Sequence, residues 1–138
     1  DLSEIVEAAI SPLKEERGHR FAISGPPVSL PPTTAVPISM IVHELCTNAL
    51  KYGALSNETG QVSIGWRASS TPGGTAISMI WSESGGPTVH PPAEEGFGTR
   101  LIANLSGQLG GEANFRYPPS GLVCHLSLLS PVEEPRDE

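Results

Sequence analysis

The sequence predicts an α+β domain, in which a mixed, mostly antiparallel sheet carries helices on one face. Apolar residues recur at helical spacing in the first half of the chain, and they alternate with polar residues, as in strands, in the second half. Helices and strands come in blocks, which favours an antiparallel or mixed sheet. The 138 residues, 38% of them apolar, suit a single domain with one core.

The N-terminal region is expected to contain a helix and then two short strands. Residues 1–17 carry apolar side chains at helical spacing. Ser11 followed by Pro12 predicts a break and a new cap within this helix, and Gly18 suits its end. Residues 20–30 are typical of two short strands around a Gly-Pro-Pro turn.

A long helix is predicted next. Thr33 or Thr34 can cap its start, and it should run to about Tyr52 with Gly53 as its stop. Pro37 must then lie in the first turn, where a missing N–H does no harm.

The second half of the chain is expected to hold two hairpins and one helix. Residues 61–82 alternate around a Thr-Pro-Gly-Gly turn, which predicts the first hairpin. Residues 84–96 have no periodicity and form a long loop of the kind that often carries function. A helix over 98–109 ends at two glycines, and 113–128 reads as a second hairpin. Residues 130–138 are expected to form a flexible acidic tail.

Composition and charge exclude several functional classes. The net charge of −7 argues against a general nucleic-acid binder and against docking on an anionic membrane. No apolar run is long enough to span a bilayer, and the acidic start does not resemble a signal peptide. The absence of an initiator Met suggests a piece of a longer protein.

Two cysteines are too few for a disulfide scaffold or a cysteine-rich zinc site. We expect Cys46 and Cys124 to be buried, reduced thiols of a cytoplasmic domain.

Four polar residues on the long helix form the first candidate site: His43, Glu44, Asn48 and Lys51. The last three are spaced so that they share one helix face. An amide oxygen can bind Mg²⁺, an ammonium group can neutralise phosphate, and a carboxylate can accept a proton. Taken alone, the group is equally typical of a solvated helix face.

The second candidate site lies at the end of a strand, where Glu83 is followed by Gly85 and Gly86. The carboxylate can accept a hydrogen bond from the amine of a buried base, and the glycines let a flat ligand approach the backbone. A simple turn at the end of a strand would look the same.

The third candidate site is a glycine-rich helix start with Gly96, Gly98, Thr99 and Arg100. Free backbone N–H groups at a helix N-terminus bind anions, and here a hydroxyl and a guanidinium group are added. The pattern lacks the spacing of Rossmann and P-loop motifs, so those two folds are not indicated.

The order of the three sites resembles the ATP-binding domain shared by gyrase-type ATPases, Hsp90, MutL and histidine kinases. They correspond to its N-box, G1 box and G2 box, with a lid between the last two. The N-box at 43–56, HELCTNALKYGALS, and the Trp-Ser-Glu at 81–83 are similar to those of the HWE histidine kinases. The resemblance covers about residues 20–128, and only Cys46 and Leu50 replace a more usual alanine.

The resemblance implies a Bergerat-type α/β sandwich that uses ATP and Mg²⁺. It would place Mg²⁺ on Asn48, put Glu44 near the γ-phosphate as base or polarising group, and let Lys51 contact phosphate. His43 would either tune this group or hydrogen-bond within the fold.

The resemblance also implies roles for the other two sites. Glu83 would recognise the adenine amine, Gly96, Gly98 and Thr99 would meet the phosphates, and residues 84–96 would form the lid. Trp81 is expected in the core, whereas Trp66 could lie in the core or on the surface.

The implied domain organisation has residues 1–19 as a connecting helical segment, 20–129 as the catalytic domain and 130–138 as the tail. His19 sits at a helix exit, so the phosphoaccepting histidine is expected in a separate dimerisation domain. The implied partners are that domain and a response regulator. The fragment is expected to be a monomer, and the whole protein is expected to be a homodimer.

Two other functions are compatible with the same fold. One is a serine kinase or an ATPase of this superfamily, which the Trp-x-Glu and the short lid disfavour. The other is a degenerate nucleotide-binding module used for docking, which the intact Glu44 and Asn48 disfavour.

Overall fold

The computed structural model describes residues 1–13, 20–92 and 96–132. The helical elements are α1 (Leu2–Ile10), η1 (Ser11–Leu13), α3 (Pro32–Lys51) and α4 (Phe97–Gln108). The strands are β1 (Phe21–Ser24), β2 (Gln61–Thr71), β3 (Gly74–Ser84), β4 (Glu112–Arg116) and β5 (Val123–Pro131). They form a five-stranded sheet of order β1-β2-β3-β5-β4, in which only the β1–β2 pair is parallel.

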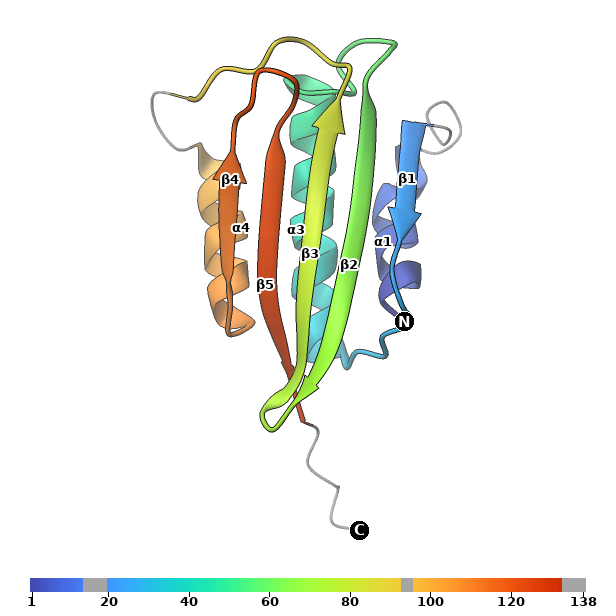
Figure 1. The fold of residues 1–138 in the computed structure, drawn as a ribbon, viewed down its shortest axis with the longest axis vertical. Coiled ribbons are helices and arrows are strands. Elements are labelled where there is room, and N and C mark those ends of the chain that lie inside the picture. Colours follow the sequence, from blue (N-terminus) through green and yellow to red (C-terminus); the bar gives the residue numbers. More distant parts are fainter. Residues whose placement is uncertain (14–19, 93–95, 133–138) are drawn as a thin grey trace.

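The three α-helices of the described residues lie together on one face of this sheet (Figure 1). The α+β prediction with a mostly antiparallel sheet is therefore confirmed. Within the same residues, no helix combines the length and apolar character needed to cross a membrane.

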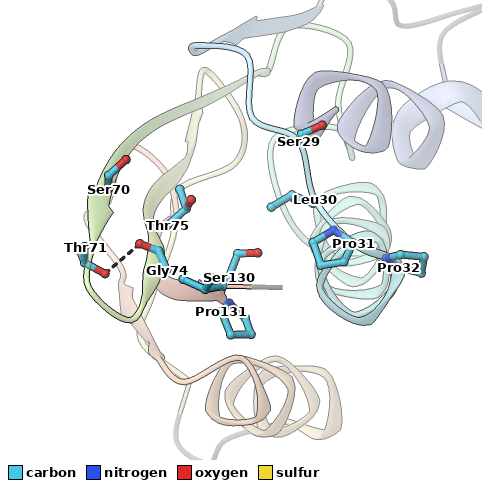
Figure 2. A pocket seen from close by; sticks show the side chains of 11 residues that line it. Ser29, Leu30, Pro31, Pro32, Ser70, Thr71, Gly74, Thr75, Ser130 and Pro131 are labelled. Atoms are coloured by element: carbon cyan, nitrogen blue, oxygen red, sulfur yellow. Dashed lines mark hydrogen bonds between the residues drawn. The ribbon is translucent and has the colours of Figure 1, made fainter. Parts of the chain in front are cut away.

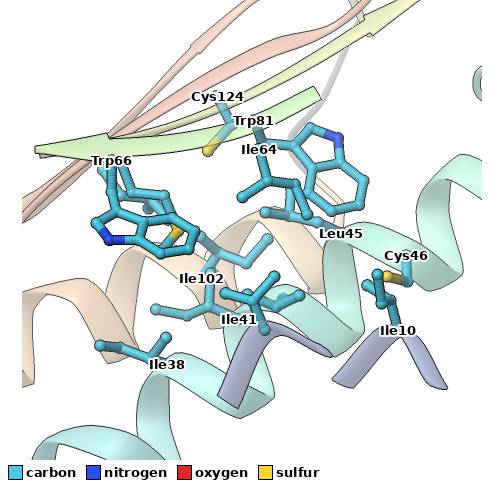
Figure 3. Close-up of a cluster of buried hydrophobic side chains, with 14 of the residues drawn as sticks. Ile10, Ile38, Ile41, Leu45, Cys46, Ile64, Trp66, Trp81, Ile102 and Cys124 are labelled. Atoms are coloured by element: carbon cyan, nitrogen blue, oxygen red, sulfur yellow. The ribbon is translucent and has the colours of Figure 1, made fainter. Parts of the chain in front are cut away.

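The core lies between the sheet and the central helix α3. Alternate residues of β3 point inward, so Ile77, Met79 and Trp81 are buried against the helices. Figure 3 shows side chains of α3, α4 and the sheet meeting in this layer. Trp81 is fully buried, as predicted, and Trp66 is also a core residue at 4% exposure.

The break predicted near Ser11 is confirmed. Asp1 caps α1 by accepting a hydrogen bond from the Ser3 backbone N–H at 2.7 Å, and the α-helix ends at Ile10 before a 3₁₀ turn. Residues 14–19 lie outside the described residues. They include the rest of the predicted helix, its predicted stop at Gly18, and His19.

The prediction of two strands within residues 20–30 is wrong in part, since only β1 forms. Pro26 and Pro27 have no N–H to offer a sheet partner. Val28 instead turns into the core, and its carbonyl accepts the Leu2 backbone N–H at 2.8 Å.

The threonine cap predicted for the long helix is also wrong. The helix begins at Pro32, a residue type favoured at the first helical position, and Pro31 precedes it without a side-chain cap. Thr34 is buried, with Oγ1 3.4 Å from Ser130 Oγ. Because of this earlier start, Pro37 lies beyond the first turn.

Both predicted hairpins and the second-half helix are confirmed. In the first hairpin Thr71 pairs with Gly74, so the turn has two residues between the paired positions. Gly110 follows α4 with φ +71°, the left-handed conformation that ends a helix. β5 extends through Pro131, so Ser130 and Pro131 belong to a strand and not to the predicted tail; residues 133–138 lie outside the described part.

Candidate functional site

The three predicted sites gather at one end of the molecule. Figure 1 shows the C-terminal end of α3, the N-terminal end of α4 and the end of β3 at the same edge of the fold. Each of these termini carries one of the predicted sites.

Glu44 and Asn48 of α3 meet the first turn of α4. Both side chains are partly buried. A methyl group built on Gly98 would overlap Glu44 Oε1 and lie 3.3 Å from Asn48 Nδ2. The carboxylate and the amide therefore lie directly against the Gly98 backbone, and two sites 50 residues apart in sequence become one.

The start of α4 has backbone donors that the helix itself does not use. Gly96 provides no side-chain cap, and the first backbone bond of the helix runs from the Arg100 N–H to the Gly96 carbonyl at 3.2 Å. The N–H groups of the first three helical residues thus have no partner within the helix. Thr99 is partly buried and Arg100 is exposed beside them.

Lys51 and His43 have exposed side chains on α3. Lys51 is the last residue of the helix. The His43 carbonyl accepts the Thr47 hydroxyl at 3.0 Å, which is a backbone contact. The imidazole of His43 is on the surface, so its role stays a prediction.

Glu83 is 4% exposed and is held by two protein donors. Its Oε1 accepts the Ala54 backbone N–H at 2.8 Å, and its Oε2 accepts the Trp81 indole N–H at 2.9 Å. This accounts for the Trp-x-Glu spacing, because residues two apart in a strand share one face of the sheet.

Gly85 and Gly86 are required by the packing of two protein loops. Gly85 has φ +72°, and its carbonyl accepts the Thr59 hydroxyl at 3.0 Å. A side chain on Gly86 would collide with the Ala54 backbone. Internal packing explains both glycines, and their contact with a ligand remains a prediction.

Arg20 is a residue of this region that sequence reasoning missed. It is only 7% exposed, and its Nη2 and Nε donate to the carbonyls of Ala54 (2.8 Å) and Gly60 (2.6 Å). It thereby holds both ends of the loop between α3 and β2. The only local signal was a charged residue directly before an apolar strand.

The donor set suits Mg²⁺ bound together with phosphate. No group of three or more His, Cys, Asp or Glu side chains in the described ranges could hold a metal without further ligands. The Asn48 amide and the Glu44 carboxylate can instead supply one or two oxygen ligands, and Mg²⁺ takes the rest from phosphate and water.

The thiols are not reactive groups of the site. Burial raises the pKa of Cys46 to about 12, and the nearby Glu83 carboxylate adds to this effect. Burial alone raises the pKa of Cys124 to about 12. Both cysteines are free and buried, as predicted, and they stay protonated at neutral pH.

An open cavity of about 620 Å³ lies at the opposite end of the fold, near the turn between β2 and β3. Figure 2 shows its lining by the segment before α3, this turn and the end of β5. Among the described residues, the lining consists of serines, threonines, prolines, a glycine, a leucine and a valine. None of the three sites predicted from the sequence lies among these lining residues.

Comparison with known proteins identifies relatives of the whole chain. No protein-family model matches the chain. A blue-light-activated histidine kinase of Brucella anthropi is 39% identical over 132 residues, which are 95% of this chain and 26% of that protein. The Brucella ovis counterpart is 36% identical over the same share of this chain and 27% of its own length. The chain thus spans about a quarter of the length of these curated relatives.

Solved structures share the fold. The blue-light-activated histidine kinase of Erythrobacter litoralis has a TM-score of 0.67 and 23% identity, covering 94% of this chain and 40% of its own. The catalytic domain of the histidine kinase ThkA has a TM-score of 0.69 and 15% identity, covering 96% of both chains. The chain therefore belongs to the histidine kinase family, and it has the fold of a histidine kinase catalytic domain.

Proposed function

We propose that the chain binds Mg·ATP and transfers its γ-phosphoryl group to a histidine in a separate domain of the same protein. The observation that carries this proposal is the contact of Gly98 with Glu44 and Asn48. It brings an amide that can bind a metal and a carboxylate to a helix start whose first N–H groups are not used within the helix. A triphosphate with its Mg²⁺ could use all three groups together.

The residues of the chain would act on the phosphates by position and charge. Asn48 would hold Mg²⁺, which neutralises phosphate charge when bound. The N–H groups of the first turn of α4, which the helix does not use, would donate to phosphate oxygens, with the Thr99 hydroxyl beside them. Lys51 and Arg100 would add positive charge. Phosphoryl transfer needs mainly such positioning and charge stabilisation.

Glu44 would orient the attacking histidine and accept its proton. A histidine nitrogen that attacks the γ-phosphorus must be held in line and lose its proton. A carboxylate beside the phosphate-binding turn can orient that imidazole and accept the proton. Its partial burial limits competition from water.

The adenine amine would donate to Glu83. A carboxylate oxygen has two lone pairs, and Ala54 and Trp81 each use one. Each oxygen therefore keeps an acceptor position for the ligand. The pair of Trp81 and Glu83, together with His43, supports the HWE type of histidine kinase.

Further partners follow from this assignment. The acceptor histidine would lie in a dimerisation domain of the same protein, and a response regulator would then receive the phosphoryl group. The whole protein would be a homodimer.

Calorimetric titration of the chain with ATP, with and without Mg²⁺, tests the proposal. We expect binding that depends on Mg²⁺ and is lost in Asn48→Ala with the thermal midpoint retained. Asn104→Ala is the matched control, because Asn104 is an exposed helical asparagine on α4. Unchanged binding by Asn48→Ala would reject the metal assignment, and no binding by the wild type would reject the function.

A further inference from the structure

We propose that Trp81 and Arg20 are positioning residues that orient the Glu83 carboxylate for the amine of a nucleobase. The preference for adenine over a 6-oxo purine would then depend on two residues that do not touch the base. This inference rests on the proposed nucleotide site and assigns its base specificity.

Trp81 holds one side of the carboxylate. Trp81 and Glu83 both point inward from β3, and the indole ring of Trp81 is completely buried. Its N–H donates to Glu83 Oε2 at 2.9 Å. Because the ring is packed in the core, this donor has a fixed direction. A hydrogen bond to a charged acceptor is also stronger than one between neutral groups.

Arg20 holds the other side through one residue, Ala54. Glu83 Oε1 accepts the Ala54 N–H at 2.8 Å, and the carbonyl of Ala54 accepts Arg20 Nη2 at 2.8 Å. Arg20 Nε donates at 2.6 Å to Gly60, at the other end of the same loop. The guanidinium group thus fixes the loop that supplies the second donor to the carboxylate.

The two donors determine how the carboxylate can turn. Each oxygen is bound to a different structural element, so the group cannot rotate without breaking a buried hydrogen bond. The lone pairs that remain have a defined direction. An exocyclic amine can donate to them, whereas a 6-oxo group would bring its own lone pairs against a negative charge. A site built in this way disfavours the wrong base, because the 6-oxo group repels the carboxylate and gives it no hydrogen bond.

Loss of one hydrogen-bond donor to Glu83 should change the affinity for the base and leave the binding of the phosphates unchanged. The phosphate-binding residues lie on α3 and α4, and neither helix supplies a donor to the carboxylate. A variant that frees the carboxylate should therefore bind adenine and 6-oxo nucleotides more equally. A general loss of stability would weaken both nucleotides alike and leave their ratio unchanged.

The test compares the affinities of ATP and inosine triphosphate, which differ at the 6 position and carry the same phosphates. Wild type, Trp81→Phe and Trp66→Phe are titrated calorimetrically with Mg²⁺ present. Trp66 is the matched control, because it is also a buried indole on the helix-covered face and donates to the Pro26 carbonyl at 2.9 Å. We expect Trp81→Phe to lower the preference for ATP about threefold to tenfold, and Trp66→Phe to keep it.

Arg20→Lys is the second variant. It tests the donor that Arg20 holds in place, the Ala54 N–H, and it keeps the proposal testable if Trp81→Phe does not fold. A lysine has one ammonium group and cannot reproduce the fork that reaches both carbonyls. We expect a reduced ATP preference here also. If the wild type prefers ATP and the folded variants keep that preference, the positioning role is wrong and the nucleotide site stands. If the wild type binds neither nucleotide, the proposed function fails, and equal binding of both would refute base recognition by Glu83.

Discussion

Replacing Gly98 by alanine adds one methyl group at the point where α4 meets α3. The new Cβ would overlap Glu44 Oε1, lie 3.2 Å from Glu44 Cδ and lie 3.3 Å from Asn48 Nδ2. Ordinary carbon contacts need about 3.5–4 Å. The carboxylate is the free end of a flexible side chain, so it should move by roughly 1 Å while the backbone stays in place.

The expected effect on the reaction is large and the effect on stability is small. A displacement of about 1 Å in a reacting group can lower the rate on the order of 100-fold, which is about 2.7 kcal/mol of transition-state stabilisation. Gly98 has no positive φ, and alanine is favoured over glycine in a helix by up to about 1 kcal/mol. This gain offsets the cost of about 1 kcal/mol for a strained Glu44 rotamer.

The assay is single-turnover phosphorylation of the acceptor histidine in the full-length kinase, with thermal unfolding of the isolated chain alongside. Gly107→Ala is the matched control, because Gly107 lies in the same helix and a Cβ there has no neighbour within 4 Å. We expect Gly107→Ala to transfer phosphate like the wild type. If Gly98→Ala does so as well, the position of Glu44 is not what the reaction requires.

Two further predictions concern stability. The folded pKa of each thiol is about 12, whereas its ordinary value is 9.0. The contribution of the protonated thiols to the free energy of unfolding should therefore be fully present below pH 9 and be lost as the pH rises from 9 to 12. The loss should be at most about 1.4 kcal/mol per pH unit for each thiol. Urea unfolding across this range should show the fall, and Cys46→Ala and Cys124→Ala should each reduce its slope; a flat profile would contradict the buried thiols. Gly111→Ala would drive a methyl group into the Ser127 carbonyl of β5, so we expect a loss of about 2–3 kcal/mol in the free energy of unfolding. Equal stability of Gly111→Ala and Gly107→Ala would show that β4 can shift to make room.

The elements predicted well are those with a strong local signal. The hairpin of β2 and β3 follows from alternation around a tight turn, and α4 follows from a periodic segment between glycines. The errors lie at boundaries, where several residues compete. Two threonines offered a cap, yet Pro32 begins the helix, because proline is favoured at the first helical position. The strand expected near Val28 is absent because its carbonyl pairs with a helix instead.

The sequence predicted most residues of the site, but it did not predict which of them are hydrogen-bonded to one another. Spacing on α3 placed Glu44, Asn48 and Lys51 together, and the motif order brought Gly98 and Glu83 into the same hypothesis. Nothing local indicated that Arg20 would reach partners 34 and 40 residues away. Nor did it indicate that both Glu83 oxygens would already hold protein donors.

By itself the sequence determined the fold class, the inward faces of the strands and the three groups of polar residues, because side-chain periodicity and glycine placement act over a few residues. Only the tertiary structure decided which groups meet. The contact of Gly98 with Glu44, and the chain of hydrogen bonds from Arg20 through Ala54 to Glu83, join residues far apart in sequence. Such contacts depend on how helices pack against the sheet, which is set by the shape of the whole core and not by any short segment.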